Sequence, residues 1–250
     1  MNQLLNRKKA GIMAVIINIC FLFVHILMFY VFSKNNVTPM AKFNIFSIIF
    51  YAVMLVIIKM GFLLFFNVAT YLEVVLHMTL AIIYTGWDSG FQITLIGMNA
   101  LAFFAEYIGR TVTGRYIPAA PLGILGMVAY LSSYIYTHNN PVPYVLSEGT
   151  IFSLQIIWAV IVFVLLILSL QLFTLLSFHS ERLLSIAATK DKLTNLPNRY
   201  HVAKYEKEYL TENRWIAMAD IDNFKKIYNL GAYITRSMFH PMFWRSNIRS

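Results

Sequence analysis

Residues 10–32 read AGIMAVIINICFLFVHILMFYVF, which is 23 consecutive positions without a charged side chain. About 20 apolar residues are enough for a helix to cross the hydrocarbon core of a membrane. Three basic residues, Arg7, Lys8 and Lys9, precede the run, and its end lacks the small residues of a signal-peptide cleavage site. We therefore interpret it as an uncleaved first span whose N-terminus lies in the cytoplasm.

Five further apolar runs follow the first. After a polar loop over 33–42, the sequence predicts spans at 43–58, 62–84, 91–108, 117–136 and 151–176. The boundary between the second and third falls near Lys59 and Gly61. An even number of spans returns the C-terminus to the cytoplasm, and this count places four basic side chains on the cytoplasmic side, as the positive-inside rule requires: Lys59, Arg110, Arg115 and Arg182.

Composition agrees with an integral protein of the cell membrane that crosses the lipid bilayer several times. The chain is 59% hydrophobic and 12% charged, against roughly 25% charged residues in an average soluble domain. Its net charge of +9 is attributed to positive-inside bias. We expect no nucleic-acid partner, because no basic stripe with interleaved aromatic residues is present. The single cysteine, Cys20, excludes an intrachain disulfide.

Ionisable residues inside the predicted spans are candidates for function, because a membrane interior makes them costly. Glu73 and His77 are four residues apart and so share one helical face. They predict an input site for a small ligand, a proton or an ion, with interhelical packing as an equal alternative. Glu106 and Arg110 have the same spacing and are interpreted as an interfacial ion pair. His25 is interpreted as a packing residue rather than a ligand.

The soluble part begins with an uninterrupted helix. Residues 177–190 contain neither Gly nor Pro and carry an apolar stripe, which is typical of a dimerising and signalling rod or of a short connector. A turn over 191–199 and a helix over 200–210 are expected next. The apolar run 215–219 then predicts a buried strand, and Asp220 and Asp222 follow at its end, where carboxylates can hold a metal ion.

Two motifs in this region resemble a known family. Residues 191–199, DKLTNLPNR, are similar to the D-x-L-T-G-L-P-N-R opening of the GGDEF family of diguanylate cyclases, with Asn195 in place of the glycine. Residues 220–227, DIDNFKKI, resemble the family's D-I-D-x-F-K-x-I. The resemblance covers roughly residues 185–227. It implies a bacterial membrane-bound signalling protein.

The resemblance also implies a fold and a chemistry. In that family, a nucleotide-cyclase-like α/β sandwich dimerises so that two GTP condense to cyclic di-GMP. Asp220 and the carbonyl of Ile221 would be ligands of Mg²⁺, and Phe224 and Lys225 would lie in the phosphate-binding turn. Mg²⁺ would neutralise the triphosphate while a 3′-hydroxyl attacks the α-phosphate.

The resemblance stops after Ile227. Tyr228 occupies the position of the family's guanine-binding asparagine, no Asp or Glu follows it, and the GGDEF hairpin is absent. We therefore expect a cyclase fragment truncated by a reading-frame change or rearrangement, without activity of its own.

The expected fold class is mostly α: a six-helix polytopic membrane bundle followed by an incomplete α/β fragment. The expected domains are a sensory input domain over 1–176, a connecting helix over 177–190, a GGDEF fragment over 191–227 and an aberrant, partly disordered tail over 228–250. Expected partners are the lipid bilayer, GTP, and a second copy or an intact GGDEF protein. The alternatives are a non-enzymatic membrane sensor or interaction protein, and a transporter.

Overall fold

The computed structural model describes residues 6–191 and 193–209 of the chain. It divides into two units, Met1–Phe178 and His179–Ser250, which are described separately below. The described residues are mostly helical, as the composition predicts. They contain no strand, and their only β-type pairing is an isolated bridge between Lys190 and Pro197. The predicted strand over 215–219 lies outside the described residues.

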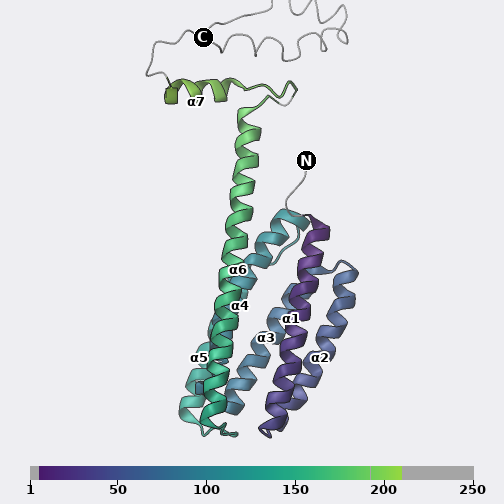
Figure 1. Cartoon of the computed structure of the whole chain (residues 1–250), viewed down its shortest axis with the longest axis vertical. Coiled ribbons are helices and arrows are strands. Elements are labelled where there is room, and N and C mark those ends of the chain that lie inside the picture. Colours follow the sequence, from purple (N-terminus) through teal and green to yellow (C-terminus); the bar gives the residue numbers. More distant parts are fainter. Residues whose placement is uncertain (1–5, 192, 210–250) are drawn as a thin grey trace, which may run out of the picture. The chain divides into compact units, whose positions relative to one another are not determined.

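The first unit is built from long antiparallel helices that reverse direction at short turns (Figure 1). They are α1 (Arg7–Lys34), α2 (Thr38–Lys59), α3 (Leu63–Thr85), α4 (Gln92–Ile108), α5 (Ala119–Asn139) and the first part of α6 (Glu148–Thr189). A 3₁₀ turn, η1 (Trp87–Ser89), precedes α4, and a π-helical turn, η2 (Gly109–Thr113), follows it.

The turn between α1 and α2 is shorter than predicted. The predicted loop over 33–42 is wrong in length, because α1 continues through Lys34 and α2 begins at Thr38. Proline near the start of a helix lacks an N–H that would be unpaired there in any case, so Pro39 fits the first turn of α2. The turn closes through Asn36, whose φ of 58° is left-handed, and through the Val37 N–H, which donates to Phe32 O.

Five of the described helices are long and apolar enough to cross a membrane: α1, α2, α3, α5 and α6. The fourth predicted span, 91–108, corresponds to α4, which has 17 residues, or about 26 Å at 1.5 Å per residue. That is near the lower end of spanning length, and η2 continues the helical path from it. Six spans therefore remain a prediction, and five apolar helices are consistent with a membrane protein.

Helix α3 lies at the centre of the unit. Buried residues make up 56% of its most apolar segment, against 17–28% in the other four apolar helices. The core around it contains Met28, Phe32, Met78, Phe91 and Trp158. Large apolar side chains on the outer faces stay exposed, such as Phe23 at 67% and Phe163 at 64%. Apolar side chains thus occupy both the core and the outer faces, as expected for helices that face lipid.

The prediction of an unbroken helix into the soluble part is confirmed. The sixth apolar run and residues 177–189 form one helix of 42 residues, α6, and the boundary between the two units falls inside it. The second unit continues with a turn and with α7 (Arg199–Tyr209), close to the predicted helix over 200–210.

Candidate functional site

The i, i+4 pair predicted on the third apolar run lies inside the bundle. Glu73 and His77 are on α3 and are 6% and 1% exposed. Their side chains approach each other, with His77 Nδ1 3.4 Å from Glu73 Oε1. The structure therefore brings together the two residues of the predicted input site.

Helix α2 supplies hydrogen bonds to both oxygens of the Glu73 carboxyl group. The Ser47 hydroxyl donates to Oε1 over 2.5 Å, and the Tyr51 hydroxyl donates to Oε2 over 2.6 Å. Ser47 and Tyr51 are also four residues apart, so one face of α2 presents both. Asn44, one turn earlier, places its Nδ2 3.4 Å from His77 Nε2.

Helix α1 adds a third ionisable residue, His25. Its Nε2 lies 3.5 Å from Glu73 Oε1, and its Nδ1 lies 2.7 Å from the backbone oxygen of Phe21. Its ring packs against the rings of Tyr51 and His77, with centroids 4.8 Å and 4.7 Å away. The interpretation of His25 as a packing residue is therefore incomplete, because it directly faces the Glu73 carboxyl group.

We call His25, Asn44, Ser47, Tyr51, Glu73 and His77 the polar cluster. All six are buried between α1, α2 and α3, in the middle of helices that are otherwise apolar. Chemically, the polar cluster offers one carboxyl group, two imidazoles and two hydroxyls within hydrogen-bonding reach. Such a set can hold a proton or a cation. It offers no surface for a large organic ligand, because its side chains fill the space between the helices.

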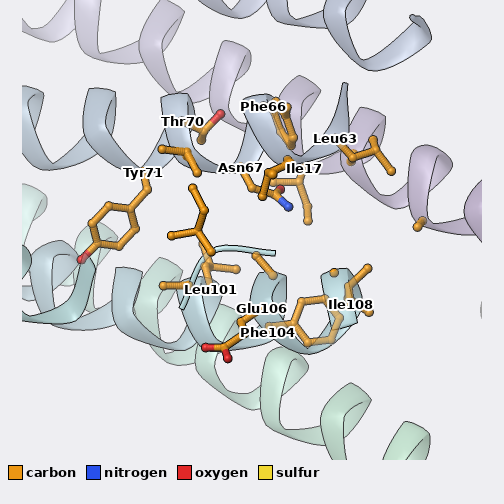
Figure 2. Close-up of a pocket in the computed structure, with 18 of the residues that line it drawn as sticks. Ile17, Leu63, Phe66, Asn67, Thr70, Tyr71, Leu101, Phe104, Glu106 and Ile108 are labelled. Carbon is orange, nitrogen blue, oxygen red and sulfur yellow. The ribbon is translucent and has the colours of Figure 1, made fainter. Parts of the chain in front are cut away.

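A separate cavity lies between α1, α3, α4 and η2, and Figure 2 shows its lining. Its volume is about 100 Å³, smaller than the roughly 300–1,000 Å³ of most small-molecule sites. Apolar side chains such as Ile17, Phe66 and Leu101 dominate it. The buried Thr70 hydroxyl, which also lines it, has no hydrogen-bond partner within 6–191 and 193–209. The cavity has room for a few waters or part of a lipid chain, and it is too small for a nucleotide.

The predicted ion pair at the end of α4 is confirmed. Arg110 Nη2 lies 2.6 Å from Glu106 Oε1, and the Arg110 guanidinium stacks over the Tyr116 ring at 3.8 Å. Glu106 Oε2 accepts a hydrogen bond from the Ala119 backbone N–H. This bond ties α4 to the start of α5, so the pair has a structural role here.

In the second unit, residues of the segment 191–199 make a compact turn. Asp191 Oδ1 accepts hydrogen bonds from the backbone N–H groups of Leu193 and Thr194 and from the Thr194 hydroxyl. These bonds, those from Thr194 foremost, hold the pKa of Asp191 below its usual value. Protonation would weaken them, so the turn is fully stabilised above the ordinary aspartate pKa and loses that contribution as pH falls through the lower, folded value.

Two asparagines complete this turn. Asn195 has a φ of 57°, a left-handed conformation that glycine adopts freely and asparagine tolerates better than most residues. Asn198 donates from its side chain to Ala188 O near the end of α6, and its Oδ1 accepts from the His201 N–H in the first turn of α7. The segment therefore links α6 to α7 through hydrogen bonds at both helix ends.

The other predicted site residues lie outside the described residues: Asp220, Ile221, Phe224 and Lys225. The chain matches no protein-family model, no curated protein and no solved structure.

Proposed function

We propose that the chain is a multi-pass membrane protein with six spans and both termini in the cytoplasm, and that it belongs to cyclic di-GMP signalling. In this proposal the first unit is an input domain, α6 carries the input out of the membrane, and the soluble part derives from a GGDEF diguanylate cyclase. An intact relative would condense two GTP on Mg²⁺ under the control of its membrane domain.

The observation that carries the proposal is the conformation of Asn195. The GGDEF opening motif has a glycine at this position, and Asn195 takes up the left-handed backbone that glycine favours. Asp191 and Asn198 match the motif as well, and each makes hydrogen bonds that shape the same turn. The residue that departs from the motif is therefore compatible with the turn that the motif would form.

The polar cluster supports the assignment of an input role to the first unit. A carboxyl group with six-percent exposure among apolar helices is costly to bury, so a function gives a reason for its presence. The pair Glu73 and His77 is the proposed centre of that site.

We expect residues 1–250 alone to form no cyclic di-GMP. Asp220, with the Ile221 carbonyl, is the proposed Mg²⁺ ligand, and Phe224 and Lys225 are the proposed phosphate contacts. From Tyr228 onward the sequence contains no Asp or Glu, so a second carboxylate ligand cannot come from there. An intact GGDEF protein would have to supply what is missing, because a second copy of this chain lacks the same carboxylate and hairpin.

The first test measures cyclic di-GMP formation from GTP and Mg²⁺ by the purified full-length protein, beside Asp220→Ala. We expect no product from either. Product that disappears with Asp220→Ala would support the family assignment and contradict the expected inactivity. Product that persists in Asp220→Ala would contradict the proposed metal ligand.

The second test joins residues 1–198 to an intact GGDEF domain at the shared L-P-N-R sequence. The expected result is cyclic di-GMP formation at a rate that Glu73→Gln changes severalfold. Glu148→Gln is the matched control, because Glu148 is exposed at the start of α6. A rate that responds equally to the two substitutions would contradict the input role of the polar cluster.

The same buried cluster also suits two alternatives. A non-enzymatic membrane sensor or interaction protein would keep the polar cluster and use α6 for assembly. A transporter would show ion or proton flux that depends on Glu73. Measuring flux into proteoliposomes distinguishes the transporter from the other two, because neither the signalling proposal nor the sensor predicts any flux.

A further inference from the structure

The hydrogen bond of His25 determines which of its ring nitrogens carries a proton. Phe21 O can only accept, so His25 Nδ1, 2.7 Å away, must donate to it. In the neutral ring, Nε2 then carries a lone pair. This Nε2 is buried and has no hydrogen-bond partner among the described residues.

That lone pair faces another electron-rich atom. Glu73 Oε1 lies 3.5 Å from His25 Nε2, and both side chains are removed from water. Among the described residues, the ion-pair partners of Glu73 are histidines, with no Lys or Arg. A carboxylate buried beside neutral imidazoles lacks a counter-charge, which is costly in a low-dielectric interior. A cation between the two atoms would remove the conflict.

The spacing of the three ionisable residues fits a metal ion. One nitrogen of His25, one of His77 and one oxygen of Glu73 all lie within 4.8 Å of one another. Glu73 Oε1 is 3.5 Å from His25 Nε2 and 3.4 Å from His77 Nδ1. Tetrahedral Zn²⁺, at about 2.0–2.2 Å from each ligand, holds its ligand atoms about 3.4 Å apart. The Glu73 oxygen is at this distance from both imidazoles, and the two imidazole nitrogens, within 4.8 Å of each other, would have to approach on binding.

The surroundings resemble the outer shell of a metal site. Metal-binding histidines usually donate their other N–H to a carbonyl or carboxylate, as His25 Nδ1 does to Phe21 O. Ligating carboxylates are usually held by hydrogen bonds, as Glu73 is by Ser47 and Tyr51. His25 and Glu73 are therefore each oriented by a group from their own or a neighbouring helix.

We propose that His25, Glu73 and His77 bind a divalent transition-metal ion of the Zn²⁺ type inside the helical bundle. Two imidazoles and one carboxylate favour such an ion over Mg²⁺ or Ca²⁺, which prefer oxygen ligands. Three protein ligands leave a fourth position open, for water or for a hydroxyl of the polar cluster. The metal is the input ligand of the proposed signalling site, and only this signalling role rests on the proposed function.

Binding requires one adjustment at His77. Its Nδ1 must present a lone pair to the metal, so its proton must reside on Nε2, which Asn44 Nδ2 now approaches at 3.4 Å. Asn44 Oδ1 is buried and has no hydrogen-bond partner in the described part of the chain. Rotation of the Asn44 amide would let Oδ1 accept from His77 Nε2–H, in exchange for the hydrogen bond that Nδ2 donates to Met40 O over 2.8 Å. The free oxygen is thus available to stabilise the ligand form of His77.

The test uses the full-length protein in detergent. It is stripped with a chelator, equilibrated with Zn²⁺, freed of loose metal and measured for zinc content. We expect about one Zn²⁺ per chain and, with Co²⁺ in its place, the intense visible absorption of a tetrahedral site. His25→Gln and Glu73→Gln should each weaken Zn²⁺ affinity by at least about tenfold. Zinc should raise the Tm of the wild type and leave the Tm of these variants unchanged.

Two matched substitutions control for adventitious binding. His138→Gln removes an exposed imidazole at the end of α5, and Glu148→Gln removes an exposed carboxylate. Both should bind Zn²⁺ as the wild type does. Equal affinity in the wild type and Glu73→Gln would overturn the proposal, as would a wild type that retains no Zn²⁺ and shows no Co²⁺ absorption. These wild-type measurements remain decisive if a variant does not fold.

Failure of the metal site and failure of the signalling role give different results. Stoichiometric zinc without any effect on the cyclic di-GMP output of the GGDEF fusion would support the metal site and contradict its signalling role. An output that depends on Glu73 in a protein that binds no metal would overturn the metal site and point to a proton as the input.

Discussion

Glu73 is the residue whose environment departs most from the apolar bundle around it. Its two oxygens take hydrogen bonds from two residues of α2, and a histidine from each of α1 and α3 faces Oε1. Three helices therefore meet at one carboxyl group. Removing a single partner leaves a buried oxygen unsatisfied, which costs more than the bond itself contributes when it forms.

Tyr51→Phe tests how much this arrangement contributes to stability. The Tyr51 ring is fully buried, and its hydroxyl is the only hydrogen-bond donor to Glu73 Oε2 among the described residues. We expect the substitution to lower the free energy of unfolding in detergent by about 1–3 kcal/mol. Tyr84→Phe is the control, because the Tyr84 hydroxyl makes no hydrogen bond to a described residue and that change should be close to neutral. Equal losses would show that the hydroxyl bond contributes nothing specific.

The sequence predicted one half of this site and missed the other. Glu73 and His77 were found because a spacing of four residues within one apolar run is visible in one dimension. His25 and the donors from α2 come from other helices, and no spacing within the sequence relates them to Glu73. The available signal was weaker: each is a polar residue inside a run that is otherwise apolar.

Asn195 allows a test of the turn between α6 and α7. Its φ of 57° is sterically unfavourable for any residue that has a Cβ. Asparagine offsets part of this cost by local hydrogen bonding of its side chain, and alanine cannot. Asn195→Ala should destabilise the turn by about 1–2 kcal/mol, so local hydrogen exchange over 189–199 should accelerate about 5- to 30-fold. Asn195→Gly should leave exchange nearly unchanged, since glycine adopts this conformation freely. Slower exchange in Asn195→Ala than in Asn195→Gly would contradict the left-handed turn.

At the scale of elements, the close approach of α4 and α6 depends on a glycine. A Cβ at Gly97 would lie 2.8 Å from Val162 Cγ1 and 3.2 Å from Cγ2, closer than van der Waals contact. The absent side chain therefore lets α6 pack against α4 within the first unit. Small residues commonly serve this purpose where helices pack in membranes.

Gly97→Ala should therefore separate these two helices. We expect a loss of about 1–3 kcal/mol in the free energy of unfolding, typical of an overpacked interior. Gly11→Ala is the matched control, because nothing lies within 4 Å of a Cβ at Gly11, and alanine should gain about 0.5–1 kcal/mol inside a helix. Both are measured by denaturant titration in the same detergent. A Gly97→Ala protein as stable as Gly11→Ala would refute the close contact.

Element positions were largely predictable, and element ends were less so. Uncharged runs identified the long helices because a helix inside a membrane needs an apolar surface over its whole length. The runs fell short of the true ends, as at α2, which starts at Thr38 and includes Lys42 in its first turns. Polar and charged residues are accepted there because a terminal turn can reach the membrane surface. Hydropathy alone therefore marks the membrane core of a helix rather than its ends.

At the scale of the molecule, charge is distributed unequally between the two ends of the first unit. Arg7 lies beside Gly61, since its Nη2 donates to Gly61 O, and Lys8, Lys9 and Lys59 belong to the same helix ends. At the opposite end the α5–α6 loop meets the end of α3, where the Tyr144 N–H donates to Tyr84 O. Asp88 and Glu148 belong to that end, as do Lys34 and Lys42, so the charges there cancel. The basic end is the one that we expect to face the cytoplasm.

Cysteine labelling tests this orientation and the number of spans together. In a Cys20→Ser background, which removes the single native cysteine, four exposed positions are changed one at a time: Asp88→Cys, Thr111→Cys, Asn140→Cys and Leu193→Cys. With six spans and a cytoplasmic N-terminus, a membrane-impermeant maleimide should label Asp88→Cys and Asn140→Cys in intact cells. The other two should react only after permeabilisation.

Helix α4 is the shortest of the six helices that correspond to the predicted spans, and the same experiment tests whether it crosses the membrane. If α4 did not cross the membrane, Thr111 would stay on the outer side with Asp88. Helices α5 and α6 would then each cross in the opposite direction. Thr111→Cys and Leu193→Cys would then react in intact cells, and Asn140→Cys would be protected. Protection of Leu193→Cys together with reaction of Asn140→Cys therefore requires that the 17 residues of α4 span the membrane, and it places the turn over 191–199 where GTP is found.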